Sequence, residues 1–399
     1  MRFTGTKVIG VRAPIINNGD DIVGIVINSI HNAILNEEFT IDDRDVIGIT
    51  ESVVARAQGN YVSVDDVANS VKEYFGENAD ITVVFPIMSR NRFSIILKGI
   101  ARAAKKVNIV FKAPCDEVGN ELVNVVNFPH DYISESAFVN FYGEPKHRFT
   151  GVNYFKLYRD IVEKENSKCK IYAVEENKFL KGFGSILSTN IIYAGIHDID
   201  EKINAITQNF QLFNYAPKII SLADICNKPS NTCGWNDTFG VLGSNKADEE
   251  TLKLFPTTQE CKFICYKIQN AIKGIYGKDV EVMVYGDGCF KDPIGGIWEL
   301  ADPVTTPGYT KGLIGTPNEL KLKYLADNDY KDSSDKEKSI KFAIENKKEN
   351  LVGDMSSQGT TPRRYVDLLA SLFDLVSGSG DKGTPIVIAK GYFDNYATD

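Results

Sequence analysis

Acidic side chains follow several predicted strands, in loops that are far apart along the chain. They are Asp20, Asp21, Asp116, Glu117, Asp237, Asp287 and Asp292. Mg²⁺ takes one or two carboxylates and fills its remaining octahedral positions with water and phosphate oxygens. Asp237 stands out because the segment W-N-D-T-F-G places the hydroxyl of Thr238 beside it. A loop aspartate more often shapes a turn or caps a helix, so a nucleotide–Mg²⁺ site requires that these loops converge.

The glycine-rich segment Ser377–Pro385 lies between a predicted helix and a predicted strand. Its glycines allow successive backbone N–H groups to turn toward one anion, so S-G-S-G-D-K-G-T-P suits a phosphate group. A turn that only reverses the direction of the chain explains the same glycines equally well. The segment lacks the Walker pattern and precedes a strand instead of opening a helix.

A second possible anion site precedes the same helix. Thr360 and Thr361 stand at the predicted helix start, and Arg363 and Arg364 follow them. Free N–H groups at a helix N-terminus attract anions, and an arginine fork binds phosphate or carboxylate through two hydrogen bonds. Helix capping by Thr361 is a compatible alternative. Two such loops around one helix predict phosphate binding.

The cysteines and histidines predict no catalytic or metal centre. The seven cysteines include no C-x-x-C pair, which favours a reducing compartment over a disulfide framework. Cys261 and Cys265 lie one helical turn apart on an apolar face, so we expect them in the core. The four histidines have neither metal-ligand spacing nor a Cys–His or Ser–His–Asp pattern.

Hydrophobic periodicity predicts a mixed α/β fold for the elements that carry these residues. The predicted strands are Lys7–Arg12, Asp45–Thr50, Ile81–Phe85, Val107–Lys112, Lys170–Val174, Lys218–Leu222, Val280–Tyr285 and Pro385–Lys390. The predicted helices are Asp21–Leu35, Ser89–Lys106, Asn153–Glu165, Ile199–Gln208, Thr258–Tyr276 and Pro362–Ser377, with an exposed charged helix in Asp329–Glu349. No regular element explains Gly286–Asn318, which favours a working loop.

Charge and hydropathy exclude several classes of protein. With 45 Lys+Arg against 53 Asp+Glu, the formal charge is −8, which disfavours general binding of nucleic acid. The apolar windows Ile81–Pro86 and Ile186–Ile196 are too short or interrupted to cross a bilayer, and the first residues alternate as in a strand. We expect a cytoplasmic protein without nucleic-acid or membrane partners.

Several of these segments together resemble the coenzyme F-420 γ-glutamyl ligases. The resemblance rests on A-P-I-I-x-x-G-D-D at 13–21, D-x-D-V-x-x-I-T-x-x-V-V with A-R-A-Q-G at 43–59, N-D-T-F-G at 236–240, D-L-L-A-S-L-F-D-L-V-S-G at 367–378 and K-G-T-P-I-V at 382–387. It covers about half of the chain. The chain looks like a long variant with extra sequence between Asn120 and Asn231 and between Gly240 and Gly353.

The resemblance implies a reaction, cofactors and a fold. Members of the family join glutamate to a phosphate-containing deazaflavin precursor, using GTP and a divalent metal, Mg²⁺ or Mn²⁺. It implies an acyl-phosphate route to an amide, a homodimer, and an α/β fold of unusual topology that is not a doubly wound sheet of Rossmann type. The expected organisation is an N-terminal part at 1–130, an insertion or second domain at 131–231 and a C-terminal part at 232–399 with a loop-rich insertion at 286–350.

The resemblance also implies site residues. The nucleotide-contacting L-P-E-I of the family falls on Ala13, Pro14, Ile15 and Ile16, and its Ser and Lys fall on Glu51 and Arg56. Its metal-binding aspartates fall on Asp116 and on Asp237 with Thr238, and its nucleotide-binding asparagine falls on Asn120. Its terminal loop falls on Ser379, Gly380, Lys382 and Gly383. We expect Thr360, Thr361, Arg363 and Arg364 at the substrate or phosphate, with Asp287, Lys291 and Asp292 lining that site.

Two departures from the family pattern leave alternatives open. Glu51 stands where the family has a neutral donor, and Ser379 replaces a metal-binding Gln. The first hypothesis is a GTP-dependent amide ligase that adds an amino acid, glutamate, to a carboxylate acceptor. The second is a nucleotide- or cofactor-binding homologue without ligase activity. A different phosphotransferase is the third.

Overall fold

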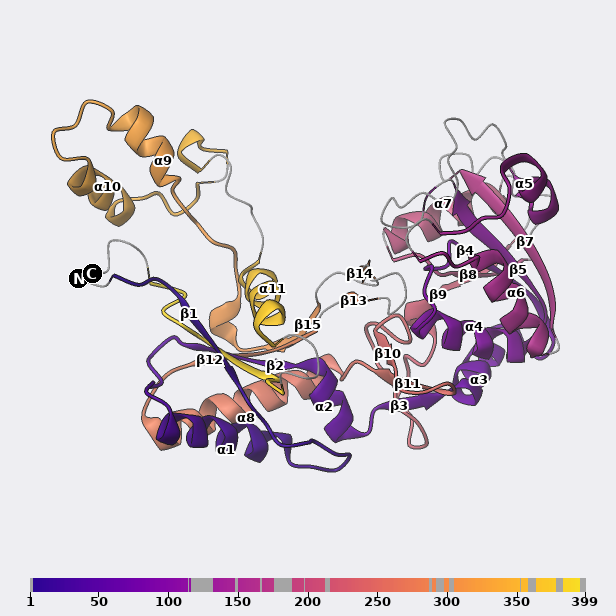
Figure 1. Cartoon of the computed structure of the whole chain (residues 1–399), viewed down its shortest axis with the longest axis horizontal. Helices are drawn as coiled ribbons and strands as arrows, with labels where there is room; N and C mark the ends of the chain where they lie inside the picture. Colours follow the sequence, from indigo (N-terminus) through magenta and orange to yellow (C-terminus); the bar gives the residue numbers. More distant parts are fainter. Residues whose placement is uncertain are drawn as a thin grey trace. The chain divides into compact units, whose positions relative to one another are not determined.

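A computed structural model gives the fold of the chain, which divides into two compact units (Figure 1). The structure describes residues 3–113, 115, 132–147, 150–165, 167–175, 189–196, 198–211, 216–286, 289–291, 298–300, 305–351, 353–357, 364–377 and 383–394. Unit 1 comprises Met1–Val54, Gln259–Gly286 and Val304–Asp399, and unit 2 comprises Ala55–Thr258 and Asp287–Pro303. Both units combine segments that are distant in sequence. The expected organisation, in which 1–130 and 232–399 form one ligase-like body around an insertion at 131–231, stays a prediction.

Unit 1 is built on a mixed five-stranded sheet in the order β1-β16-β2-β12-β15. Its strands are β1 Lys7–Val11, β2 Val46–Thr50, β12 Glu281–Gly286, β15 Thr305–Tyr309 and β16 Ile386–Lys390. β2 and β12 are parallel, and β16 pairs antiparallel with both β1 and β2. The ends of β1, β2 and β12 therefore lie at the same edge of the sheet as the beginning of β16.

Helices cover both faces of this sheet, as Figure 1 shows. They are α1 Ile22–Asn36 and α8 Thr258–Tyr276 on one face and α11 Tyr365–Ser377 on the other. Apolar residues of β2, β12 and β16 pack against Leu369 and Phe373 of α11. Gly48 permits this close packing, because a β-carbon there would lie 2.5 Å from Cε2 of Phe373.

A smaller group of elements connects β15 to α11 within unit 1. It contains η4 Lys311–Leu313, α9 Leu322–Tyr324, η5 Leu325–Asp329, α10 Lys336–Glu345 and η6 Met355–Ser357. No residue of α10 is buried, which agrees with the charged, exposed helix that the sequence predicts within Asp329–Glu349.

Unit 2 contains a six-stranded sheet in the order β6-β7-β5-β4-β8-β9. The strands are β4 Ala79–Val84, β5 Ala104–Ala113, β6 Ile133–Ser134, β7 Lys168–Glu175, β8 Asn190–Tyr193 and β9 Lys218–Ser221. All pairs are parallel except that of β6 with β7. In chain order, β7-β5-β4-β8-β9 is the 3-2-1-4-5 arrangement of a doubly wound sheet.

Helices lie on both faces of the unit 2 sheet. Its helices are α3 Val64–Phe75, α4 Arg92–Ala103, α5 Glu135–Tyr142, α6 Tyr154–Lys164 and α7 Ile199–Gln211, with η3 Leu222–Asp224. Val83 and Ile109 face the core formed with α3, α4 and α6, and Val84 and Val110 face α7. The mixed α/β class is confirmed. The expected exclusion of a doubly wound sheet needs correction, because the strand order of unit 2 is that of a doubly wound sheet. This topology does not require a glycine fingerprint.

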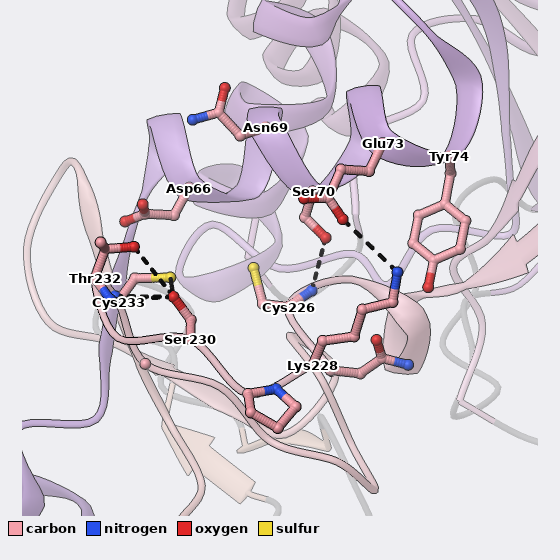
Figure 2. A pocket seen from close by; sticks show the side chains of 13 residues that line it. Asp66, Asn69, Ser70, Glu73, Tyr74, Cys226, Lys228, Ser230, Thr232 and Cys233 are labelled. Atoms are coloured by element: carbon pink, nitrogen blue, oxygen red, sulfur yellow. Dashed lines mark hydrogen bonds and ion pairs between the residues drawn. The ribbon is translucent and has the colours of Figure 1, made fainter.

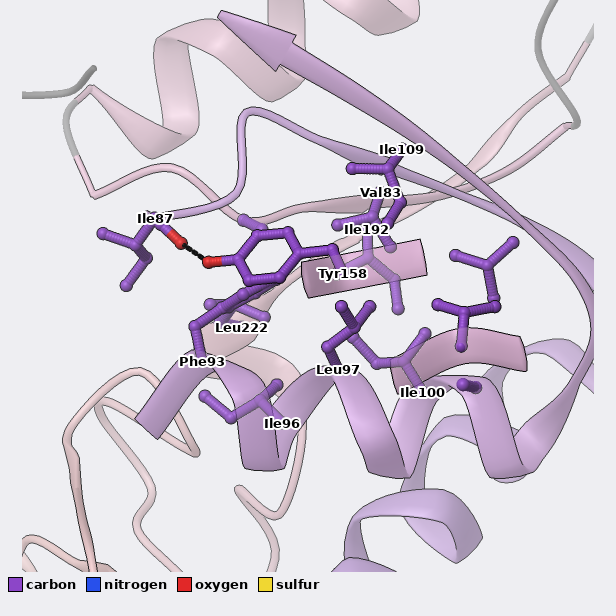
Figure 3. Packing of buried hydrophobic residues seen from close by; sticks show 14 of the residues in the cluster. Val83, Ile87, Phe93, Ile96, Leu97, Ile100, Ile109, Tyr158, Ile192 and Leu222 are labelled. Atoms are coloured by element: carbon purple, nitrogen blue, oxygen red, sulfur yellow. Dashed lines mark hydrogen bonds between the residues drawn. The ribbon is translucent and has the colours of Figure 1, made fainter. Parts of the chain in front are cut away.

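A buried tyrosine fixes the loop after β4, which comes first along the chain among the strands of the doubly wound sheet. Tyr158 of α6 packs among Phe93, Phe111 and Tyr154. Its hydroxyl donates to the carbonyl of Ile87, as Figure 3 shows, and it accepts the N–H of Ser89 at 2.9 Å. The residues after β4 are therefore held by a side chain from the neighbouring helix.

The remaining elements of unit 2 form small sheets. β3 Tyr61–Ser63, β10 Ser244–Lys246 and β11 Thr251–Leu254 form one, and β13 Cys289–Lys291 pairs with β14 Trp298–Leu300. Helix α2 Glu51–Gln58 crosses the division between the units. Within the described residues, no helix is long and apolar enough to cross a membrane.

Candidate active site

One edge of the unit 1 sheet collects segments that the sequence singles out separately. The N–H of Ala13, after β1, donates to the carbonyl of Gly383, before β16, at 3.2 Å. The N–H of Thr50, at the end of β2, donates to the carbonyl of Pro385 at 3.0 Å. The expected nucleotide-contacting residues Ala13–Ile16 thus lie beside the described end of the glycine-rich segment.

Glu51 lies at the same edge but inside the protein. Its side chain is only 2% exposed, and a β-carbon on Gly286 would lie 2.6 Å from its Cγ. Thr305, which pairs with Gly286 across the sheet, lies beside that same position. The side chain of Glu51 is therefore packed against the end of β12 and the start of β15.

The segment after β1 is mostly open to solvent. Ile15 is 80% exposed, and only Ile16 of the predicted four-residue segment is buried. Asp20 accepts the N–H of Asn17 at 2.6 Å, and Asp21 is the N-cap residue of α1. Asp20 therefore takes the turn role that the sequence leaves open as its alternative, whereas Asp21 stands at the helix start without a side-chain capping hydrogen bond.

Many of the expected site residues lie outside the described part of the chain. They are Asp116, Asn120, Asp287, Asp292, Thr360, Thr361, Arg363, Ser379, Gly380 and Lys382. Lys291 ends β13, where its backbone pairs with Trp298. The convergence of Asp116 with Asp237 stays a prediction.

Arg364, directly before α11, binds a carboxylate of that helix through two hydrogen bonds. Its Nη2 and Nε lie 2.7 Å and 2.9 Å from the two carboxylate oxygens of Asp367. These hydrogen bonds raise the pKa of Arg364. A phosphate at this position would have to share the guanidinium with Asp367.

The N-D-T-F-G segment forms a turn in unit 2 that presents oxygen ligands to solvent. Asp237 and Thr238 are exposed. The Thr238 hydroxyl donates to Asp237 Oδ1 at 3.3 Å and lies 3.5 Å from the hydroxyl of Thr258. One carboxylate with neighbouring hydroxyls is a set of hard oxygen donors, which suits Mg²⁺ or Mn²⁺.

This donor set fits a cation that keeps most of its water. In the described ranges, no three His, Cys, Asp or Glu side chains gather closely enough to hold a metal ion. Mg²⁺ is commonly bound by one or two carboxylates, with waters and substrate phosphates as its other ligands. Asp237 and Thr238 therefore offer an open pair of oxygen donors and not a closed metal cage.

A family model described as F420-0:Gamma-glutamyl ligase matches residues 10–391. The chain belongs to this family. The match extends over the sheet edge of unit 1 and the Asp237–Thr238 turn of unit 2. Membership implies a ligase that forms amide bonds on a small-molecule substrate, and the family uses a nucleotide and a metal. No curated protein matches the chain.

Two asparagines of this family member support the Asp237 turn. Asn236 is buried, and its Oδ1 accepts the N–H of Phe239 at 2.6 Å. Asn60 accepts the N–H of Trp235 at 2.9 Å. In the sequence, Asn236 is only a letter of the N-D-T-F-G motif, and nothing singles out Asn60, because its contacts join residues far apart in the chain.

The loop before the turn and α3 enclose a hollow of about 290 Å³ (Figure 2). Asp66 and Glu73 of α3 line it together with Lys228, which pairs with Glu73 at 3.7 Å. The thiols of Cys226 and Cys233 also line it. Burial, with a further contribution from nearby Cys233, raises the pKa of Cys226 to about 12.

Proposed function

We propose that the chain is a GTP- and divalent-metal-dependent amide ligase that joins glutamate to a carboxylate-bearing acceptor through an acyl phosphate. The observation that carries the proposal is the family match over residues 10–391. The structure adds support, because Ala13 and Gly383 meet at one sheet edge and Asp237 and Thr238 offer hard oxygen ligands. We further propose a cytoplasmic homodimer with no nucleic-acid partner.

Within this proposal, the residues of unit 1 and those of unit 2 have different tasks. The backbone of Ala13–Ile16 and Gly383 would bind the nucleotide, aided by Arg56 and the glycine-rich segment. Asp237 and Thr238, with Asp116, would hold a cation that neutralises phosphate charge. Phosphoryl transfer requires mainly positioning and charge neutralisation, and no covalent enzyme intermediate.

The proposed reaction has two balanced steps. A carboxylate oxygen of the acceptor attacks the γ-phosphorus of GTP, the bond from phosphorus to the bridging oxygen breaks, and GDP leaves. The α-amine of glutamate then attacks the acyl carbon, inorganic phosphate leaves, and the amine proton is released to solvent. One amide, one GDP and one phosphate form for each GTP consumed.

Product measurements with the full chain test this proposal. We expect GDP and phosphate release only when GTP, Mg²⁺ or Mn²⁺, the deazaflavin precursor and glutamate are all present. Asp237→Ala should abolish the release, whereas Asp248→Ala, which alters an exposed aspartate in another loop, should leave it unchanged. Absence of phosphate release with every nucleotide and acceptor tried would contradict the proposal.

A binding protein without ligase activity is the competing function. Glu51 favours it, because a charged residue stands where ligases of the family have a neutral donor. Calorimetric titration with GTP, GDP and the deazaflavin precursor, with and without Mg²⁺, separates the two. Tight binding of these ligands without turnover would favour the binding protein.

A further inference from the structure

The turn that carries Asp237 depends on one buried side chain. Asn236 is only 1% exposed. Its Oδ1 accepts the N–H of Thr238 at 3.0 Å and that of Phe239 at 2.6 Å. The N–H of Gly240 donates to the Asn236 carbonyl at 3.1 Å, which closes the turn. One side chain thus fixes the backbone directly after Asp237.

The amide nitrogen of Asn236 ties the turn to the end of β11. Nδ2 donates to the carbonyls of Phe255 and Pro256 at 2.9 Å and 3.1 Å. The backbone N–H of Asn236 donates to the Cys226 carbonyl at 3.1 Å. An aspartate has the same size but lacks the two N–H donors, so it would present an oxygen to two carbonyl oxygens.

Asn60 holds Trp235, the residue directly before the N-D-T-F-G motif, to the end of β11. Its Oδ1 accepts the N–H of Trp235 at 2.9 Å, and its Nδ2 donates to Phe255 at 2.8 Å. The Phe255 carbonyl is therefore shared by Asn60 and Asn236. Trp235 and Asn236 are the two residues before Asp237. Both are therefore anchored to the carbonyl of Phe255, directly after β11, Trp235 through Asn60 and Asn236 directly.

We infer that Asn236 and Asn60 are positioning residues that orient Asp237 and Thr238 toward a divalent cation. The inference rests on the proposed metal site. Mg²⁺ and Mn²⁺ demand accurate placement of few protein ligands, and groups that orient metal ligands commonly affect metal affinity 10- to 100-fold. Neither asparagine would be a ligand of the cation, because the side-chain contacts of both are with the backbone of the turn and of residues 254–256.

Mn²⁺ binding to the full chain, measured from the free-ion electron paramagnetic resonance signal, tests this inference without turnover. We expect Asn236→Asp to raise the Kd for Mn²⁺ about tenfold or more. Asn231→Asp introduces the same charge at an exposed position of the same loop, so it should leave the Kd within about twofold. A merely structural asparagine would lower the melting temperature and leave the Kd of the folded protein unchanged.

If Asn236→Asp does not fold, Asn60→Asp provides a second test of the inference. We expect Asn60→Asp to weaken Mn²⁺ binding several-fold as well. Folded Asn236→Asp and Asn60→Asp proteins with the wild-type Kd would overturn the positioning role alone, provided that Asp237→Ala loses Mn²⁺. Mn²⁺ binding that is equally tight in wild type and Asp237→Ala would overturn the metal site and the positioning role together.

Discussion

A β-carbon on Gly240 would lie 2.5 Å from the carbonyl oxygen of Ala223. Gly240 closes the N-D-T-F-G turn with φ of 48°, in the left-handed region, so both space and backbone conformation require glycine. We expect Gly240→Ala to lower the free energy of unfolding by about 2 kcal/mol or more. Urea denaturation of the purified variant measures this loss.

Gly274 provides the matched control. It lies in helix α8, and a β-carbon there would meet nothing within 4 Å. Gly274→Ala should therefore stabilise the protein by about 0.5–1 kcal/mol through helix propensity. Equal unfolding free energies for the two variants would contradict the close packing assigned to Gly240.

Lys390 is the partner of a buried carboxylate at the far end of β16. Its Nζ lies 2.7 Å from Asp45, which is 1% exposed, and 2.8 Å from Asp42. Removing the ammonium leaves Asp45 buried without its charge partner, so Lys390→Met should cost about 3 kcal/mol at neutral pH. Lys278→Met removes an exposed ion pair with Asp43 and should cost under about 1 kcal/mol.

The pH dependence of stability follows from the same cluster. Burial opposes the charge of Lys390, but hydrogen bonds with Asp42 and Asp45 outweigh it and raise its pKa above 10.5. The stabilisation is therefore complete below about pH 10.5 and is lost as the pH rises further. The hydrogen bond from Lys390 lowers the pKa of Asp42, so the contribution of Asp42 begins to be lost as the pH falls below 3.8, whereas burial raises the pKa of Asp45, which acts in the opposite direction. A Lys390→Met protein that retains the full alkaline loss would contradict this assignment.

Tyr158 should stabilise unit 2 through its hydroxyl as well as its ring. Tyr158→Phe keeps the aromatic packing but leaves the carbonyl of Ile87 without a buried donor. We expect a loss of about 1–2 kcal/mol in the free energy of unfolding. Tyr266→Phe, at an exposed site on α8, should change stability by less than about 0.5 kcal/mol.

The two thiols of the hollow should differ in reactivity. Because burial raises the pKa of Cys226 to about 12, it carries about a thousandfold less thiolate near neutral pH than it would with its ordinary pKa of 9.0. Iodoacetamide should alkylate the half-buried Cys233 first, and peptide mass mapping over time measures the order. Alkylation of Cys226 at the rate of Cys233 would show that its thiol is not shielded.

The sequence predicts the elements with strong periodicity well. Helix α8 has the predicted bounds Thr258–Tyr276. The apolar run V-I-G-I at the start of β2 indicates a strand, as observed. Helix α3 is not among the predicted helices, although Ser63 and Asp66 form a capping box at its start. That motif and the buried positions 64, 67, 68 and 71 were sufficient signals for a helix.

Other features depend on tertiary contacts that no local pattern contains. The prediction of an irregular stretch from Gly286 to Asn318 is wrong for Thr305–Tyr309, which form β15 at the edge of the sheet. Pro307 and Gly308 suggest a turn, but an edge strand tolerates proline. A β-carbon on Gly308 would lie 2.6 Å from the backbone nitrogen of Lys262, so this glycine serves helix packing.

The candidate site also combines residues that a local sequence motif indicates with residues whose place depends on tertiary contacts. The N-D-T-F-G motif singles out Asp237 and Thr238 as candidates, because the family resemblance implies a metal-binding pair there. Their metal-binding role stays a prediction. The burial of Glu51 could not be predicted, because it depends on the space left by Gly286 on a neighbouring strand. Asn60 carries no local signal either, since its partners lie at 235, 254 and 255.

The most direct test of the ligase proposal follows an oxygen atom from the acceptor. The deazaflavin precursor, with its carboxylate labelled with heavy oxygen, is incubated with the full chain, GTP, Mg²⁺ and glutamate, and the released phosphate is analysed by mass spectrometry. An acyl phosphate predicts one labelled oxygen in inorganic phosphate for each amide formed. Amide formation with unlabelled phosphate, or phosphate release without amide, would contradict the proposed reaction.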